Sequence, residues 1–248
     1  MVDFSKTIIH CSSLGKLTTE PRNKADKDAG NLSETTKAHL IEVYAEQRYG
    51  FKRDISNRYT NKGNICEPTA IMELSKFAGI LMEKNEQVFK NDWIIGTPDV
   101  IVPEKKILFD TKCCYDWITL LENIEGPDTD NIHQLEGYLE ILGYEKAYIV
   151  KILLDHPEEE IAREKYRLFT AGNYISEESP DFLRKWQEKE KTMRFEHFPV
   201  QERILMFEVL PNPDYIEKAR KKVEKSREFL KEFHETHKKF NNSFNFSS

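Results

Sequence analysis

Residues 93–114 read WIIGTPDVIVPEKKILFDTKCC, and this stretch decides the fold. Apolar residues dominate three runs, which are separated by Gly96-Thr97-Pro98 and by a charged turn at 103–106. β-Branched and aromatic residues favour strands, whereas Gly and Pro interrupt them. The stretch therefore predicts a β meander or hairpin with strands at 93–96, 99–102 and 107–112.

Two acidic residues and one lysine lie in these predicted strands. Residues two apart on a strand share a face, so Asp110 and Lys112 project together. Asp99 stands eleven residues earlier on the neighbouring strand, where its carboxylate can meet that of Asp110. Most D-x-K tripeptides on strands are exposed surface ion pairs. Here the charges interrupt apolar strands, and burying charge is costly without a function or a partner, so we predict a catalytic site.

A third acid, Glu67, precedes a helix that we predict to begin at Pro68, because Pro suits a first helical turn. The apolar residues of this helix recur at helical spacing: Ile71, Leu74, Ala78, Leu81 and Met82. Glu67 falls on the same stripe and should face the protein. Mg²⁺ prefers carboxylate oxygens and can promote hydrolysis of a phosphodiester, so the three acids predict a metal site. Lys112 would position or deprotonate the attacking water or counter charge on the phosphate, and the sequence leaves this choice open.

Helices and strands alternate along the rest of the chain, which indicates an α/β or α+β fold. Ser33 offers an N-cap for a helix that continues to about Tyr49. Residues 20–33 and 115–130 are predicted to be loops. Further helices are predicted at 132–142, 158–166, 180–191 and 214–235, and strands at 147–152 and 204–209.

The 248 residues carry a formal net charge of −6. This length predicts a single domain over 1–240, with a charged insertion at about 155–200 and a disordered tail at 241–248. No apolar run reaches the roughly 18 residues of a membrane helix, and the start lacks a signal peptide, so we expect a cytoplasmic protein with no membrane partner. Four scattered cysteines predict reduced thiols.

The acid and lysine residues resemble the motifs of a known family. Gly96-Thr97-Pro98-Asp99 followed by Asp110-Thr111-Lys112 resembles the signature of the PD-(D/E)XK nuclease superfamily. Gly63 and Glu67 resemble the G-x-x-x-E motif of its λ-exonuclease-like, YqaJ-type branch. Aspartate at position 110 replaces the commoner glutamate of that branch, which the signature allows.

Two further segments extend the resemblance. Gln134 and Tyr138 resemble the Q-x-x-x-Y helix motif, which lies beside the active site of that branch and contacts DNA. Residues 9–16 look like its opening segment, with Ser12 at the place of a serine that binds a terminal phosphate. The resemblance covers most of the chain outside 155–200, where the longer and more acidic insertion departs from the branch.

The resemblance implies a restriction-endonuclease-like core, in which a central mixed sheet is flanked by helices. It implies a phage-type recombination exonuclease that hydrolyses one strand of duplex DNA from a free end, in the 5′ to 3′ direction, and hands the other strand to a single-strand annealing protein. Some members form trimeric rings. Asp99, Asp110 and Lys112 would be catalytic, and Glu67, Asp99, Asp110 and the carbonyl of Thr111 would bind Mg²⁺, which Mn²⁺ can replace.

Blander interpretations stay open. Gln134 and Tyr138 could be a polar residue and a core aromatic of an ordinary amphipathic helix. Tyr115 and Trp117 could stack on DNA or pack beneath their own loop. The predicted C-terminal helix holds six cations that could follow a DNA backbone or form a solvated face: Lys218, Arg220, Lys221, Lys222, Lys225 and Arg227.

Two other functions fit the same core. A structure- or sequence-specific DNA endonuclease would use the same acids and lysine. A non-catalytic DNA-binding or assembly module would have no need of them, which disfavours this third reading.

Overall fold

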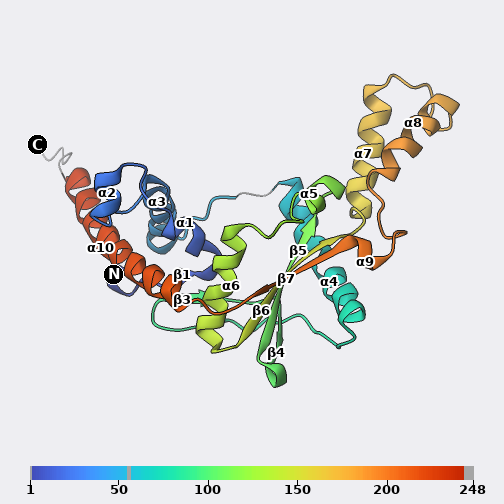
Figure 1. Ribbon diagram of the computed structural model, residues 1–248. Coiled ribbons are helices and arrows are strands. Elements are labelled where there is room, and N and C mark those ends of the chain that lie inside the picture. The colour runs from blue at the N-terminus through green and yellow to red at the C-terminus, as the bar shows by residue number, and fades with distance from the viewer. Residues whose placement is uncertain (1, 55–56, 243–248) are drawn as a thin grey trace, which may run out of the picture.

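Two mixed β-sheets form the centre of the molecule, which the computed structural model describes for residues 2–54 and 57–242 (Figure 1). The smaller sheet has the order β1-β3-β2, with β1 parallel and β2 antiparallel to β3. The larger sheet has the order β4-β5-β6-β7, and only β5 and β6 are parallel. The strands are β1 (Ile9–His10), β2 (Phe89–Lys90), β3 (Ile94–Gly96), β4 (Val100–Val102), β5 (Ile107–Cys114), β6 (Lys146–Leu153) and β7 (Ile204–Val209).

Helices cover both faces of the larger sheet. On one face α6 (Thr129–Leu142) packs Leu135 and Leu139 against Leu108 of β5. On the other face α4 (Arg58–Ala78) packs its apolar residues against Phe109 of β5 and Val150 of β6. The parallel strands β5 and β6 are therefore buried on both sides, which is why they are nearly continuous apolar runs and why a charge within them is exceptional.

The N-terminal segments and the last helix pack together on the α6 side of the molecule. Ser33 caps α3 as predicted, because its hydroxyl accepts a hydrogen bond from the amide of Thr36 at 3.0 Å. These elements are η1 (Phe4–Lys6), η2 (Cys11–Ser13), α1 (Leu14–Thr18), α2 (Lys24–Asp28), α3 (Glu34–Tyr49) and α10 (Pro213–Asn242). The predicted loop at 20–33 thus contains a short helix.

The predicted start of the second helix is wrong. The helix α4 begins at Arg58, and Pro68 lies inside it. Asn57 and Thr60 form a capping box that outweighs the Pro signal, since each side chain bonds the backbone amide of the other. Pro68 removes one hydrogen bond to the carbonyl of Asn64, whose exposed position lets water replace the donor. Leu81, predicted to be apolar core, is 85% exposed.

Short elements were also missed because they lack a long periodic pattern. The strands β1 and β2 have two residues each, and the 3-10 turn η3 (Pro103–Lys105) joins β4 to β5. The predicted loop at 115–130 contains α5 (Trp117–Leu121), which Asp116 caps through the amide of Thr119. The helix at 180–191 and the strand at 204–209 have the predicted ends, and the other predicted strands and helices are present with shifted ends.

The segment predicted as an insertion forms a helical hairpin that projects from the sheets (Figure 1). It comprises α7 (Glu158–Ala171) and α8 (Pro180–Lys191), and α9 (Val200–Arg203) leads back to β7. Ile161, Phe182, Trp186 and Met193 give it a small core of its own. In the part of the chain that is described, no helix is long and apolar enough to cross a bilayer. The helix α10 continues to Asn242, and the rest of the predicted tail lies outside the described residues.

Candidate active site

Asp110 and Lys112 form an ion pair in the middle of the larger sheet. Both project from β5, and Lys112 Nζ lies 2.5 Å from Asp110 Oδ2. The Asp110 side chain is 1% exposed, whereas that of Lys112 is 34% exposed. The carboxylate therefore lies at the base of the site and the ammonium reaches toward its surface, as the two-residue period predicted.

Burial and neighbouring charges set the protonation of this pair. Burial raises the pKa of Asp110 to about 6, Lys112 opposes this rise, and the charge of Asp99 adds to it. Burial lowers the pKa of Lys112, but the charges of Asp110 and Asp99 outweigh burial and raise the pKa above its ordinary value. At neutral pH the pair is a carboxylate and an ammonium.

Asp99 occupies the point at which β4 separates from β5. The ladder between these strands ends at the pair Val100 and Phe109. Beyond it, Asp99 Oδ2 accepts hydrogen bonds from the backbone amide of Thr111 at 2.6 Å and from its hydroxyl at 2.9 Å. The Asp99 carboxylate thus accepts the hydrogen bond of the Thr111 amide at the place where the pairing of β4 with β5 has ended. The arrangement brings the two aspartates together as the sequence predicted.

Glu67 approaches this site from α4 but has a partner of its own. Its carboxylate lies 3.2 Å from Lys84 Nζ, and the side chain is 22% exposed. Its charge also contributes to the raised pKa of Lys112. Glu67 therefore faces the site as predicted, with Lys84 as a partner that the sequence did not reveal.

Gln134 and Tyr138 connect α6 to β5. The amide nitrogen of Gln134 donates to Asp110 Oδ1 at 3.3 Å and to the Tyr138 hydroxyl at 2.8 Å. The Tyr138 hydroxyl donates to the carbonyl of Thr97 at 3.3 Å. Gly96 makes room for this ring, because a Cβ there would lie 2.3 Å from the Tyr138 ring. The two residues thus form a polar chain that ends on Asp110.

The acids fit a hard cation with few protein ligands. Among residues 2–54 and 57–242, no group of three His, Cys, Asp or Glu side chains is arranged to hold a metal. Asp110 Oδ2 is buried and has the Lys112 ammonium as its close contact, with Asp99 beside it, so a cation would share this oxygen with Lys112. Mg²⁺ binds through one or two carboxylates and keeps several waters. A site of two aspartates and the Thr111 carbonyl is therefore suitable, and Glu67 would join only by leaving Lys84.

Ser12 lies in the exposed turn η2, beside α6. The preceding residue, Cys11, packs against Gly96 and Gly137, where added Cβ atoms would lie 3.2 and 2.9 Å from its sulfur. Ser12 lines a cavity of about 550 Å³ together with Lys16, His39 and Arg53. These side chains are chemically suited to phosphate, and the predicted role of Ser12 in phosphate binding stays a prediction.

Two buried lysines near the site were missed from the sequence. Lys151 is paired with Lys112 in the β5–β6 register, is 6% exposed and lies 3.2 Å from Asp128. Lys62 is 1% exposed and donates to the carbonyl of Tyr115 at 2.9 Å. A lysine within the apolar strand 147–152 was a signal for Lys151. The partner of Lys62 is 53 residues away, and no local pattern indicates it.

Tyr115 and Trp117 are engaged in packing. The Tyr115 ring lies 4.7 Å from that of Tyr59 and 4.5 Å from that of His156. Trp117 meets Phe198 edge to face at 5.2 Å. Of the two roles considered for these aromatic residues, the contacts favour packing beneath the loop.

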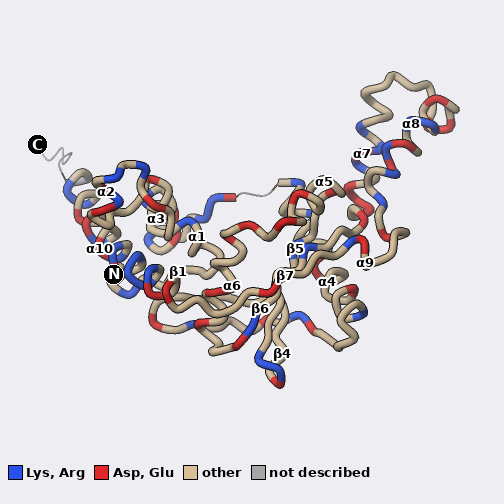
Figure 2. The backbone as a smooth tube through the Cα atoms, viewed as in Figure 1, with Lys and Arg blue, Asp and Glu red and all other residues tan. Residues whose placement is uncertain are grey.

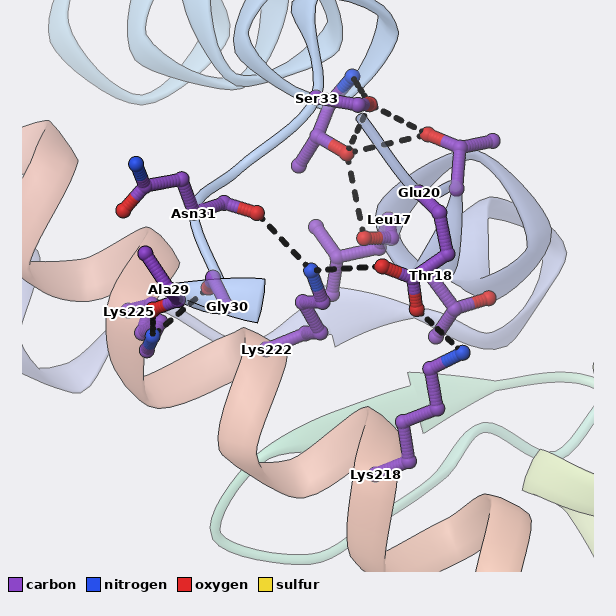
Figure 3. A network of polar contacts seen from close by, with 12 residues as sticks. Leu17, Thr18, Glu20, Ala29, Gly30, Asn31, Ser33, Lys218, Lys222 and Lys225 are labelled. Atoms are coloured by element: carbon purple, nitrogen blue, oxygen red, sulfur yellow. Dashed lines mark hydrogen bonds and ion pairs between the residues drawn. The ribbon is translucent and has the colours of Figure 1, made fainter. Parts of the chain in front are cut away.

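The cations of α10 serve the fold (Figure 3). Lys218 pairs with Glu20 at 2.5 Å, and Lys222 donates to the carbonyl of Asn31 at 3.0 Å. Lys225 donates to the carbonyl of Gly30 at 2.7 Å. Arg227 binds the carbonyls of Thr7 and Asp92, Arg220 pairs with Glu140, and Lys221 pairs with Glu217. All six cations have partners within the protein, which favours a structural role over DNA tracking.

Comparison with solved structures identifies close relatives in fold. A phage-related exonuclease from Haemophilus somnus 129PT aligns with a TM-score of 0.72 and 25% identity, over 94% of this chain and 97% of that chain. An alkaline exonuclease from Laribacter hongkongensis aligns with a TM-score of 0.64 and 12% identity, over 96% and 95% of the two chains. The same enzyme in complex with dAMP aligns with a TM-score of 0.63 and 14% identity, over 95% and 94%.

Sequence comparison alone does not find this relationship, because no family model and no curated protein matches the chain. The structural alignments, in contrast, cover nearly the whole of both chains. They confirm the mixed α/β fold and the resemblance drawn from the motifs. The chain therefore has the λ-exonuclease-like fold of the phage-related and alkaline exonucleases.

Proposed function

We propose that this chain is a metal-dependent DNA exonuclease of the phage recombination type. The observation that carries the proposal is the buried Asp110, which is paired with Lys112 and held by Gln134 in the fold of known exonucleases. A buried carboxylate linked to a polar chain is costly to maintain in an apolar sheet, so a structural role alone explains it poorly. The Laribacter enzyme in complex with dAMP supports DNA as the substrate class.

The chain's own residues suggest how the site would act. Asp99, Asp110 and the Thr111 carbonyl would hold Mg²⁺, which when bound would stabilise charge that develops on the scissile phosphate. Gln134 fixes one oxygen of Asp110 and so orients its carboxylate toward the site. Thr111 fixes Asp99 in the same way.

Lys112 is best suited to a role as an ammonium. Its raised pKa keeps it protonated at neutral pH, and an ammonium donates hydrogen bonds but accepts none. It can therefore bind a phosphate oxygen and orient the reacting group. Acting as a general base would first require the loss of a proton that Asp110 and Asp99 stabilise.

The finer features of the activity belong to the same proposal. The resemblance supports duplex DNA with free ends as the substrate, cutting in the 5′ to 3′ direction, and a single-strand annealing protein as partner. A homotrimer is the assembly that it suggests. None of these depends on the assignment of Asp110 and Lys112.

The test uses end-labelled duplexes with a 5′-phosphate, a 5′-hydroxyl or blocked ends, incubated with Mg²⁺ or Mn²⁺. We expect a ladder of products that begins at free ends, dependence on the metal, and no product from Asp110→Asn. No cleavage of any DNA by wild-type protein would contradict the proposal. Nicking of closed circular DNA would favour the endonuclease, and tight DNA binding without turnover would favour the binding module.

A further inference from the structure

A cleft opens where the α7–α8 hairpin meets the body of the protein. It encloses about 680 Å³ between the first residue of α4, the segment that follows β5, and the facing sides of α7 and α8. In Figure 1 the hairpin stands beside α5 at this point. Pockets of about 300–1,000 Å³ accept small ligands, so the cleft is too small for a duplex and large enough for part of one DNA strand.

The cleft is basic although the protein as a whole is acidic. Four cations line it against two carboxylates, in a chain whose net charge is −6. Figure 2 shows basic residues on both α7 and α8. The charged residues of the lining are Arg58, Asp116, Glu164, Arg167, Lys189 and Lys191.

The two carboxylates are already engaged. Asp116 accepts the amide and the hydroxyl of Thr119 as the cap of α5, both at 2.8 Å. Glu164 lies 2.7 Å from Arg167 and 3.9 Å from Lys189. The cleft therefore keeps an excess of positive charge that no carboxylate of its lining neutralises.

Two of the cations, Arg58 and Lys191, form no ion pair among the residues that the structure describes, although the charge of Glu160 acts on Arg58. Arg58 donates to the neutral hydroxyl of Tyr59 at 2.8 Å and lies 5.0 Å from the centre of the Tyr115 ring. Lys191 is exposed at the end of α8, and no ion pair with a described carboxylate is found for it. This differs from α10, where every cation named above has a partner, and it leaves Arg58 and Lys191 available to an anionic ligand.

The floor of the cleft is fixed to the catalytic strand. Tyr115 follows β5 directly, and both Lys62 and His156 contact its carbonyl oxygen at 2.9 Å. Tyr115 stands three residues beyond Lys112, a distance of about 10 Å along an extended strand. Since stacked nucleotides of one strand are about 3.4 Å apart, the cleft lies roughly three nucleotides from the site of cutting.

We infer that this basic cleft binds the sugar–phosphate backbone of a single DNA strand that leads to or from the catalytic site. The inference rests on the proposed nuclease function and names the form of DNA that the cleft takes. Phosphates bind Arg58, Lys189 and Lys191. The bases face two exposed apolar side chains: Ile118 in the lining, and Tyr59, whose ring lies 4.7 Å from that of Tyr115.

The experiment measures DNA binding without cleavage. The full chain is titrated, in EDTA, against a fluorescent single strand of about 15 nucleotides and, separately, against a blunt duplex of the same length, between about 50 and 200 mM salt. The variants are Lys191→Glu and the double variant Lys189→Glu/Lys191→Glu. The matched control is Arg184→Glu/Lys185→Glu, which makes the same charge change on the same helix outside the cleft lining.

We expect the double variant to bind about tenfold more weakly or worse at low salt. Its slope of log affinity against log salt should fall by about 1.4, or 0.7 for each lost phosphate contact, and that of Lys191→Glu by about 0.7. The control should keep the wild-type slope, and thermal unfolding should show that all variants fold. The double variant loses the ion pair of Lys189 with Glu164, which can impair folding. Lys191→Glu keeps that ion pair, so it tests the inference even if the double variant does not fold.

Equal slopes in wild type and cleft variants, or an equal loss in the control, would overturn the inference. A loss confined to blunt duplex DNA would overturn the assignment to a single strand. Wild-type protein that cleaves DNA but shows unchanged slopes in the variants would refute the inference and leave the nuclease proposal standing. Protein that binds DNA through these lysines but cleaves no DNA would refute the nuclease proposal and leave the assignment of the cleft to DNA binding standing.

Discussion

The strands of the proposed active site and the last helix both carry lysines, but the lysines have different kinds of partner. On β5 and β6, Lys112 and Lys151 lie side by side within an apolar sheet, next to carboxylates. On α10, Lys218, Lys222 and Lys225 bind Glu20 and backbone carbonyls of the N-terminal segment. The helix has more cations, yet the strands hold the site. The number of cations in a segment is therefore a poor guide to contact with phosphate.

The difference lies in what each cation neutralises. When a lysine donates a hydrogen bond to a backbone carbonyl or pairs with a surface carboxylate, the acceptor has its partner. The contact then stabilises the packing of two parts of the fold. The ammonium of Lys112 faces two aspartates at once, so negative charge remains available beside it. We therefore assign α10 to stability and β5 to chemistry, and the following predictions test this division.

The largest effect is expected on the catalytic lysine. Lys112→Met keeps the length of the side chain and removes its charge, so cleavage should fall at least about 10²–10³-fold, the usual loss for one donor to a developing charge. Single-turnover cleavage measures this. Lys221→Met on α10, where the lysine is exposed and pairs with Glu217, is the control and should change the rate less than twofold. A similar loss of cleavage rate in both variants would contradict the assignment of β5 to chemistry and α10 to stability.

A smaller effect on the rate is expected at Gln134. Its removal frees Asp110 Oδ1 and the Tyr138 hydroxyl, so Gln134→Ala should lower cleavage about 10–100-fold through a less well oriented carboxylate. The same single-turnover assay measures this. Tyr138→Phe keeps Gln134 and should lose less. If Tyr138→Phe lost as much activity as Gln134→Ala, the tyrosine hydroxyl would be the more important group.

On α10 the expected effect is on stability. Lys222 is 6% exposed and bonds the carbonyl of Asn31, so Lys222→Ala should lower the free energy of unfolding by about 2 kcal/mol. Urea denaturation measures it, and the cleavage rate per folded molecule should be unchanged. A normal stability with reduced cleavage would place α10 in the DNA path after all.

No effect on cleavage is expected at Glu136, which tests whether burial of a charge is enough to indicate chemistry. Glu136 is 4% exposed on α6, and its Oε2 has no hydrogen-bond partner among the described residues. Burial raises its pKa to about 7, and a hydrogen bond with Asn212 opposes this rise. Between the ordinary pKa and this raised one the folded state binds more protons than the unfolded state, so stability falls as pH rises.

Glu136→Gln removes that dependence on pH. Relative to wild type, the variant should gain up to about 3 kcal/mol of stability as pH rises from about 4 to 8, and its cleavage rate should stay the same. Urea denaturation at both pH values measures the gain. A loss of cleavage would show that Glu136 takes part in the reaction, and a parallel pH dependence in both proteins would refute the raised pKa.

Local patterns predicted those parts of the site whose residues are close in sequence. The alternation along β5 put Asp110 with Lys112, and the short connection to β4 put Asp99 beside them. The motif on α6 led to Gln134 and Tyr138, although only the structure shows that the amide reaches Asp110. Long periodic segments predicted the mixture of helices and strands, and the family resemblance implied a central sheet flanked by helices.

Distant partners could not be predicted. Lys84 follows α4 in a segment without periodicity, so its pairing with Glu67 left no signal. Lys222 and Asn31 are 191 residues apart, and nothing in either segment indicates the other. The start of α4 was missed because a Pro within a helix usually marks its beginning, whereas here a capping box upstream decided it. In each case tertiary contacts outweighed the local preference.

The bond from Thr111 to Asp99 also bears on the order of folding. It joins residues 12 apart across a hairpin, whereas the bond from Gln134 to Asp110 spans 24 residues and needs the next helix. Short loops close fastest, so the two aspartates should come together as soon as the hairpin forms. The amide proton of Thr111 would report this step, and pulsed hydrogen exchange during refolding should show it protected earlier than the strand pair β6–β7. The acidic centre is then an early nucleus on which the later helices assemble.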